Sequence, residues 1–261
     1  MKRIRNVFGI IFMAMSLLGC SKKTNQSSET TELNVFVAAS LNKVMTEIVQ
    51  EYNKQKPDVK ILLNANSSGT LMTQIREGYS CDIFFSAAQN QMNTLEKEGF
   101  LVAESRHDVL NNKLVIIALK DSTTRVRGIE NLEEAASLAL AGTSVPAGKY
   151  TRLALEKLGK LSILENLEVS EQTNVSKVVI SVLEGSCETG TAYYSDIYGF
   201  EDKLKIIQEF PQELTGDIIY PAALIKNEKA SETQKKEAEE FLQFILESKE
   251  IFKAYYFDPI L

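Results

Sequence analysis

The sequence predicts an α/β fold, because runs typical of buried strands alternate with runs typical of amphipathic helices from residue 33 to the C-terminus. The first apolar run, LNVFVA (33–38), has no helical spacing and is predicted to be a strand. The segment that follows it (41–55) has apolar residues three and four positions apart, which marks one face of a helix. With 261 residues, 44% of them hydrophobic, the chain is long enough for one large domain or two lobes.

The same alternation continues to the end of the chain. Further strands are predicted at 58–65, 81–87, 112–120, 138–142, 191–194, 203–210 and 217–225. Helices are predicted at 70–78 and 90–99, from about Lys149, from about Val175, and from Ser231 onward. Strands that are separated by helices favour a mostly parallel sheet with helices on its faces.

The N-terminus has the pattern of an export signal. A basic segment, MKRIRN, precedes a short apolar run and the sequence LLGC (17–20), which resembles the bacterial lipobox. Residues 1–19 are therefore predicted to be a signal peptide, with lipid attached to Cys20 and residues 20–32 forming a flexible tether. The alternative is an N-terminal anchor that stays uncleaved. The working part of the chain is expected outside the cytoplasm, anchored to the cell membrane by lipid.

Charge and composition exclude several classes of function. The formal net charge is −6, and loss of Lys2, Arg3 and Arg5 with the signal peptide would make it −9. Such an acidic protein is a poor candidate for binding nucleic acid. The single histidine, His107, cannot build a multi-histidine metal site and is expected at the surface. Cys81 and Cys187 are interpreted as buried free thiols, although export would also permit a disulfide.

Four junctions between a strand and a helix carry small or hydroxyl residues and no central charge. They are AASLN (38–42), NSSGT (66–70), SVPAGKY (144–150) and TNVSK (173–177). Free N–H groups at a helix start, together with the positive end of the helix dipole, can bind an anion. Helix capping by Ser, Thr or Asn explains any one junction alone. Four such junctions together favour a site for a small anion.

An enzyme alternative rests on SLNK (40–43), which fits the S-x-x-K motif of penicillin-binding proteins and β-lactamases. In that hypothesis Ser40 is the nucleophile and Lys43 the base of an exported serine hydrolase. The companion SDN and KTG motifs are absent from the sequence. We therefore expect no enzyme, and expect Lys43 on the solvent face of its helix.

Five blocks, in order along the chain, resemble the molybdate-binding receptors of ABC importers. They are VFVAASLNKVM, NSSGTLMTQI, DIFFSAAQNQM, VPAGKYTRLALEKLG and GTAYYSDI. The resemblance implies a two-lobed periplasmic-binding-protein fold of type II with the ligand between the lobes. Lobe one would comprise residues 33–111 and 212–261, and lobe two residues 112–211.

The resemblance also implies a ligand and the residues that bind it. Ser40 and Ser68 of lobe one would bind molybdate with their hydroxyl and N–H groups. Lobe two would add the N–H groups of Ala147 and Val175 and the hydroxyl of Tyr193. Tungstate would bind similarly, and another tetrahedral oxyanion is the alternative ligand. A monomer without a cofactor that delivers its ligand to an ABC permease is expected, and Ser40 is also expected to cap its helix.

Overall fold

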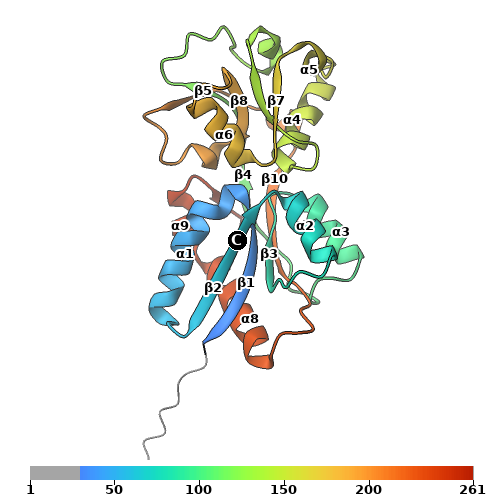
Figure 1. Ribbon diagram of the computed structural model, residues 1–261, viewed down its shortest axis with the longest axis vertical. Helices are drawn as coiled ribbons and strands as arrows, with labels where there is room; N and C mark the ends of the chain where they lie inside the picture. Colours follow the sequence, from blue (N-terminus) through green and yellow to red (C-terminus); the bar gives the residue numbers. More distant parts are fainter. Residues whose placement is uncertain (1–29, 261) are drawn as a thin grey trace, which may run out of the picture.

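The computed structural model describes residues 30–260, which form two lobes stacked along the long axis of the molecule (Figure 1). The predicted two-lobed fold is confirmed. Each lobe has its own β-sheet with helices against it; β4 leads from lobe one toward lobe two, and β10 returns in the opposite direction (Figure 1). We call the lobe with the six-stranded sheet lobe one and the lobe with the five-stranded sheet lobe two.

The elements of lobe one come from both ends of the described chain. Its strands are β1 (Thr31–Ala38), β2 (Val59–Asn66), β3 (Ile83–Phe85), β4 (His107–Asn112), β10 (Ile218–Leu224) and β11 (Asp258–Pro259). Its helices are η1 (Ala39–Leu41), α1 (Asn42–Gln55), α2 (Ser68–Arg76), α3 (Gln89–Lys97), α8 (Glu232–Glu247) and α9 (Lys249–Ala254).

Lobe two is formed by the middle of the chain. Its strands are β5 (Leu114–Leu119), β6 (Leu138–Ala141), β7 (Val169–Gln172), β8 (Thr189–Tyr193) and β9 (Leu204–Glu209). Its helices are η2 (Ile129–Glu134), α4 (Pro146–Lys157), α5 (Ile163–Asn166), α6 (Val175–Leu183) and η3 (Tyr194–Ile197). The short helix α7 (Gln212–Thr215) lies in the return to lobe one and packs against α4, and Lys157 Nζ donates to the Glu213 carbonyl at 2.8 Å.

The two sheets share one arrangement of their parallel strands. The strand orders are β11-β4-β10-β3-β1-β2 and β7-β6-β8-β5-β9, so that β1 and β6 each pair in parallel with two neighbours. The remaining pairs are antiparallel. The sheets are thus more mixed than the mostly parallel ones predicted. All the antiparallel pairs involve β5, β10 or β11: β5 is the first strand to enter lobe two, and β10 and β11 belong to the segment that returns to lobe one.

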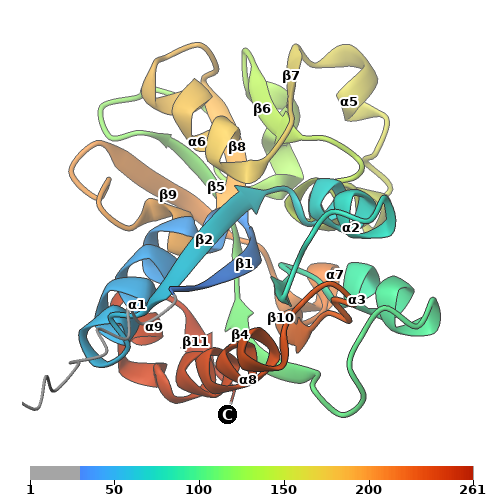
Figure 2. The same cartoon turned by 60° about the horizontal axis from the view of Figure 1, so that its bottom comes forward.

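The core of lobe one shows why the sequence pattern predicts these elements. Helix α1 buries Val44, Met45 and Ile48, which are spaced three and four apart, and β1 buries Leu33, Val35 and Val37 on alternate positions. Helix α8 also packs on β1. These contacts fix the direction of β1 and β2, whose C-terminal ends point toward lobe two (Figure 2).

Three strands were not predicted from the sequence. Strand β4, HDVLNN, is too polar for the expected pattern, yet it is held between β10 and β11. It contains His107, which is half-buried and not the surface residue expected. Strands β7 and β11 were also missed. Strand β1 begins at Thr31, so the last two residues of the expected tether pair with β2.

Some expectations about export fall on residues outside the described part of the chain. The signal peptide, Cys20 and the tether up to residue 29 all lie there. In the described part, Cys81 and Cys187 are free, buried thiols that lie in different lobes. No helix within residues 30–260 is long and apolar enough to cross a bilayer.

Candidate functional site

A small cavity lies between the lobes, at the C-terminal ends of the parallel strands. Its space for the centre of a water-sized sphere is about 10 Å³. The lining residues follow β1, β2 and β3 of lobe one and β6, β7 and β8 of lobe two: Ala38, Ala39, Ser40, Ser67, Ser68, Ala87, Val145, Pro146, Val175 and Tyr193. Ligands of open α/β sheets bind at this position. The lining contains no charged side chain, and the enclosed space is small.

The structure brings four of the five expected ligand residues into this lining. Ser40, Ser68, Val175 and Tyr193 line the cavity, and each is less than a tenth exposed. Ala147 is not in the lining, but it is fully buried and directly follows two residues that are.

Ser68 is the first residue of α2 and is held by lobe one itself. Its Oγ accepts a hydrogen bond from the Ala87 N–H at 3.0 Å. The preceding residue, Ser67, caps the helix by accepting from the Thr70 N–H at 3.1 Å. The N–H groups of Ser68 and Gly69, in the first turn, have no partner within the helix. Because the Ser68 oxygen already accepts, its own proton is available to the cavity.

The expectation that Ser40 caps its helix is wrong. Helix η1 starts after Ala38 and α1 starts after Leu41, and neither has a side-chain cap. The Ser40 Oγ instead lies 3.0 Å from the hydroxyl of Tyr220, a fully buried residue on β10. The side chain of Ser40 therefore points to the hinge strands and the cavity, because the chain turns through a 3-10 helix before α1 begins.

Lobe two presents helix starts from two directions. Helix α4 begins at Pro146, three residues earlier than predicted, and its first turn has no side-chain cap. Helix α6 begins at Val175, as predicted, and the Asn174 side chain accepts from the Lys177 N–H at 3.1 Å. The N–H groups of Ala147 and Val175 lie in these first turns, where no carbonyl of the same helix can accept from them.

Tyr193 is the polar side chain of lobe two that faces the cavity. It is 1% exposed, and its hydroxyl lies beside that of Tyr220 but makes no hydrogen bond of good geometry with it or with any other described residue. Burial raises the pKa of Tyr193 well above its usual value, so the hydroxyl keeps its proton. An unpaired buried hydroxyl is costly, typically about 1–3 kcal/mol. An anion in the cavity would remove this cost by accepting a hydrogen bond from the hydroxyl.

A carboxyl group lies behind Tyr193. Asp196 Oδ2 accepts from the Tyr193 N–H at 3.0 Å, and burial raises the pKa of Asp196 to about 7 against the lowering effects of that hydrogen bond and of Lys43. At neutral pH this carboxyl is therefore only partly ionised. Its repulsion of an anion in the cavity is reduced accordingly.

The two lobes are in contact around the cavity, so the conformation is closed. A Cβ atom on Gly69 of lobe one would lie 2.4 Å from the carbonyl oxygen of Ser144 of lobe two. Lys43 is exposed on its helix, as expected, but it also reaches lobe two. Its Nζ donates to the Tyr198 carbonyl at 2.7 Å and lies 3.9 Å from the centre of the Phe200 ring.

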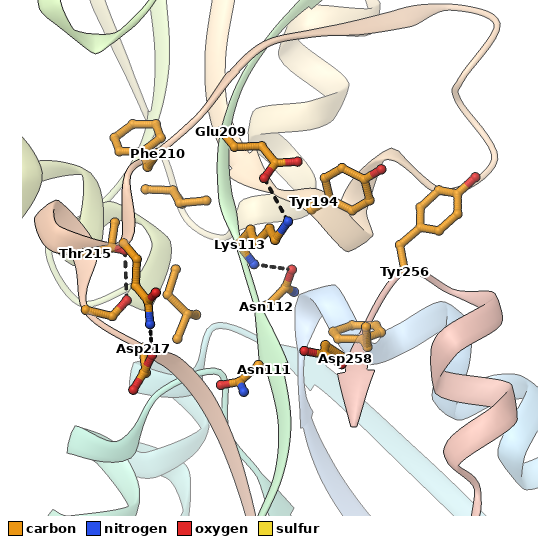
Figure 3. Close-up of a pocket in the computed structure, with 15 residues that line it drawn as sticks. Asn111, Asn112, Lys113, Tyr194, Glu209, Phe210, Thr215, Asp217, Tyr256 and Asp258 are labelled. Atoms are coloured by element: carbon orange, nitrogen blue, oxygen red, sulfur yellow. Dashed lines mark hydrogen bonds and ion pairs between the residues drawn. The ribbon is translucent and has the colours of Figure 1, made fainter. Parts of the chain in front are cut away.

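The larger cavity at the hinge has the wrong charge for an anion. Its volume is about 610 Å³, and Figure 3 shows Glu209, Asp217 and Asp258 around it. Its lysine, Lys113, is paired with Glu209 at 2.9 Å. The cavity between the lobes therefore remains the candidate anion site, although it is much smaller.

The geometry gives no support to a hydrolase that uses Ser40 and Lys43. The partner of the Ser40 hydroxyl is Tyr220, and the Lys43 ammonium group bonds to the Tyr198 carbonyl. Burial lowers the pKa of Lys43, although Asp196 and Glu201 oppose this shift. Within residues 30–260, no group of three or more His, Cys, Asp or Glu side chains could hold a metal ion.

Sequence reasoning missed Tyr220, the partner of Ser40. It lies in the apolar run 217–225, where an aromatic residue is expected to belong to the core. Ser67 and Ala87 lie in two of the five blocks that resemble molybdate receptors, but the sequence alone indicates no ligand role for them. A two-lobed chain with a small buried cavity between its lobes has the architecture of a periplasmic-type solute-binding protein.

Comparison with known proteins agrees with this class. Residues 33–258 match the family model described as bacterial extracellular solute-binding protein, and the chain belongs to this family. It is 32% identical to the Bacillus subtilis protein YvgL, a candidate ABC transporter substrate-binding lipoprotein, with 92% of each chain covered. It is 29% identical to the molybdate-binding protein ModA of Escherichia coli, over 77% of this chain and 80% of ModA.

Solved structures lead to the same group. A substrate-binding domain from Clostridium difficile, assigned to a candidate molybdenum ABC transporter, is 33% identical. It covers 88% of this chain and 99% of its own, with a TM-score of 0.65. The resemblance to molybdate receptors that the sequence motifs indicate is therefore confirmed.

Proposed function

We propose that this protein captures molybdate, and tungstate equally, between its two lobes and delivers the ion to an ABC importer. The observation that carries the proposal is the buried, unpartnered hydroxyl of Tyr193 in a cavity that has no charged lining. ModA of Escherichia coli and the Clostridium difficile domain, which is assigned to a candidate molybdenum transporter, support the identity of the ion.

The proposed ligand shell consists of neutral donors only. The hydroxyl groups of Ser40, Ser68 and Tyr193 and the N–H groups of Ala147 and Val175 would point at the oxygens of the ion. Hydrogen bonds to a charged group contribute about 1.5–3 kcal/mol each. Five such bonds suffice to hold a dianion without a salt bridge. Because the donors are fixed in position, the strength of their hydrogen bonds depends on where the oxygens of the ion lie, and the site would therefore distinguish tetrahedral ions by size.

Hydrogen phosphate is expected to bind poorly. Near neutral pH it carries at least one proton, which would face donors in this site or remain unpaired at a cost of about 1–3 kcal/mol. Molybdate and tungstate carry no proton and accept at every oxygen. Sulfate is also unprotonated, so only the size of the closed cavity can disfavour it.

The proposal includes the place where the protein works. The sequence LLGC supports lipid attachment at Cys20 after removal of residues 1–19. The B. subtilis relative is named a lipoprotein, which favours the same anchor here. An extracytoplasmic, membrane-anchored receptor would hold its ion close to the permease that accepts it.

Calorimetric titration of the protein without its signal peptide tests the ligand. We expect tight binding of molybdate and tungstate, weak binding of sulfate and no measurable binding of phosphate at pH 7 and pH 8.5. Small-angle scattering should show a smaller radius of gyration with saturating molybdate. Phosphate binding as tight as tungstate binding would mean that an acceptor lines the site and that the residue assignment is wrong.

A further inference from the structure

A chain of buried hydrogen bonds leads from the hinge to Ser40. Asn112, the last residue of β4, places its side-chain nitrogen 3.1 Å from the hydroxyl oxygen of Tyr220. The Tyr220 hydroxyl in turn lies 3.0 Å from Ser40 Oγ. Asn112 and Ser40 are 9% and 8% exposed and Tyr220 is fully buried. Water therefore has little access to this chain, and its protons must be arranged among its own members.

The orientation of Asn112 is fixed by its other contacts. Its Oδ1 accepts from the Lys113 N–H at 2.8 Å, a bond drawn in Figure 3. The oxygen end is thereby identified, and the opposite end is the NH₂ group. That group donates to the Ser195 Oγ at 2.8 Å and to the Tyr220 oxygen. Both protons of the amide are used, and Tyr220 receives one of them.

This direction determines where the Tyr220 proton goes. Burial raises the pKa of Tyr220 well above its usual value, so that it keeps its single proton. Since its oxygen already accepts from Asn112, the proton is left to be donated, and Ser40 Oγ is within reach. If Ser40 donated to Tyr220 instead, the tyrosine proton would have no acceptor among the hydrogen bonds that Tyr220 makes and would be left to the poorly aligned Tyr193 hydroxyl, which is unfavourable.

We infer that Asn112 and Tyr220 are positioning residues that leave the Ser40 proton free to be donated into the ligand cavity. A hydroxyl that accepts one hydrogen bond also becomes a better donor, because bonds in a chain polarise one another. The inference rests on the proposed function, since it concerns the same anion site. It adds two residues outside the cavity lining that control how one donor in the lining is used.

The chain also connects the two lobes. Ser195 belongs to lobe two, whereas Tyr220 and Ser40 belong to lobe one, and Asn112 bonds to both sides. The Ser195 end is held by the sheet of lobe two, because Leu114 pairs with Tyr193 and the Tyr194 N–H donates to the Lys113 carbonyl at 2.9 Å. The amide is thereby fixed at the hinge in the orientation that donates to Tyr220.

A double-mutant cycle tests the inference. Molybdate affinity is measured for the wild type, Tyr220→Phe, Ser40→Ala and the double variant, with the unfolding midpoint of each ligand-free protein recorded alongside. We expect Tyr220→Phe to weaken binding about five- to tenfold, Ser40→Ala by more, and the double variant to equal Ser40→Ala. Effects that multiply in the double variant, or a Tyr220→Phe protein of wild-type affinity, would overturn the inference.

Two further variants make the test specific. Tyr52→Phe removes the hydroxyl of another buried tyrosine, one that contacts Glu237 far from the cleft, and should not change affinity. Asn112→Asp replaces the donor to Tyr220 with an acceptor and diverts the tyrosine proton from Ser40. Part of the affinity that Asn112→Asp loses should no longer be lost when Ser40 is already alanine, whereas the repulsion by the added charge should persist in both proteins. If Asn112→Asp lowered molybdate affinity equally in the wild type and in Ser40→Ala, the inference that Asn112 acts through Ser40 would be contradicted.

The titration also separates this inference from the function. If the wild type binds none of the four oxyanions, the proposed function and the inference both fail before any variant is made. If the wild type binds molybdate but the cycle is additive, only the inference fails.

Discussion

The two walls of the cleft offer donors of different kinds. The hydroxyls of Ser40 and Ser68 in lobe one each have a buried partner, Tyr220 and the Ala87 N–H, respectively. Tyr193 in lobe two has no partner for its hydroxyl. The wall of lobe one is therefore built in advance of the ligand. The wall of lobe two contains a polar group that only a ligand would satisfy, and its contribution depends on closure.

The two kinds of donor can be distinguished by mutation, because removing a hydroxyl that has a protein partner should lower the stability of the ligand-free protein, whereas removing one without a partner should not. Removing a serine from lobe one leaves its partner unpaired, which lowers stability as well as affinity. Removing the Tyr193 hydroxyl leaves nothing unpaired in the ligand-free protein. Measurements of binding and of unfolding on the same variants can therefore separate the two walls.

The largest effect is expected from preventing the walls from meeting. In Gly69→Ala, the new Cβ would lie 2.4 Å from the Ser144 carbonyl oxygen across the cleft, so the lobes cannot close fully. Overpacking of this kind costs about 3 kcal/mol or more against a rigid backbone, and molybdate affinity should fall about a hundredfold. Titration measures the affinity, and scattering should show that the variant no longer contracts with ligand.

Gly148→Ala is the matched control for this prediction. Its Cβ would lie 2.1 Å from the Ala141 carbonyl oxygen, within lobe two. This variant should lower the unfolding midpoint, whereas Gly69→Ala should leave it unchanged. If both variants lower stability equally, the contact at Gly69 is not specific to the closed cleft.

The second largest effect is expected from the wall of lobe one. Ser68→Ala removes a donor to the ion and leaves the Ala87 N–H without its 3.0 Å partner. The free energy of molybdate binding should become less favourable by roughly 1.5–3 kcal/mol, and the free energy of unfolding should fall by about 1–3 kcal/mol. Titration and chemical denaturation measure the two losses. Wild-type affinity would remove Ser68 from the ligand shell.

The third prediction concerns the wall of lobe two. Tyr193→Phe should weaken molybdate binding about tenfold, at the lower end of the value of a charge-assisted bond. The ligand-free variant should unfold at the same midpoint as the wild type or higher, since no partner is lost. A lowered midpoint would show that this hydroxyl has a structural partner and would abolish the contrast between the walls.

The sequence predicts the secondary structure better than it predicts the individual residues of the candidate site. The helices α1 and α6 and the strands β1 and β6 follow from local apolar spacing, which the core then uses. The four candidate anion-binding junctions were proposed from residue types at predicted helix starts. The choice of Tyr193 depended on resemblance to a family, because an aromatic residue in a strand ordinarily belongs to the core.

The partner of Ser40 could not be predicted in this way. Tyr220 and Asn112 lie 108 positions apart, and they meet because β4 and β10 pair antiparallel with Asn112 opposite Ile218 and Leu110 opposite Tyr220. Residues two positions apart on a strand face the same side of the sheet, so Asn112 and Tyr220 share a face. Residue types in either strand alone show neither this pairing nor its register.

The smallest effect is expected at Lys43, which joins the outer edges of the two walls. Its ammonium group donates to the Tyr198 carbonyl and lies over the Phe200 ring. Lys43→Met keeps much of the side chain but loses both contacts, which favour the closed form. Exposed interactions of this kind contribute about 0–1 kcal/mol, so affinity should fall no more than about fivefold. The loss should appear in the dissociation rate, since the contacts form only after the lobes meet, and stopped-flow measurements can resolve it.

A hydrolase that used Lys43 as its base would behave differently, because an acylating β-lactam would label Ser40 in the wild type and fail to do so in Lys43→Met. Mass spectrometry should find no adduct in either protein, and an adduct on Ser40 would overturn the assignment of this chain as a binding protein.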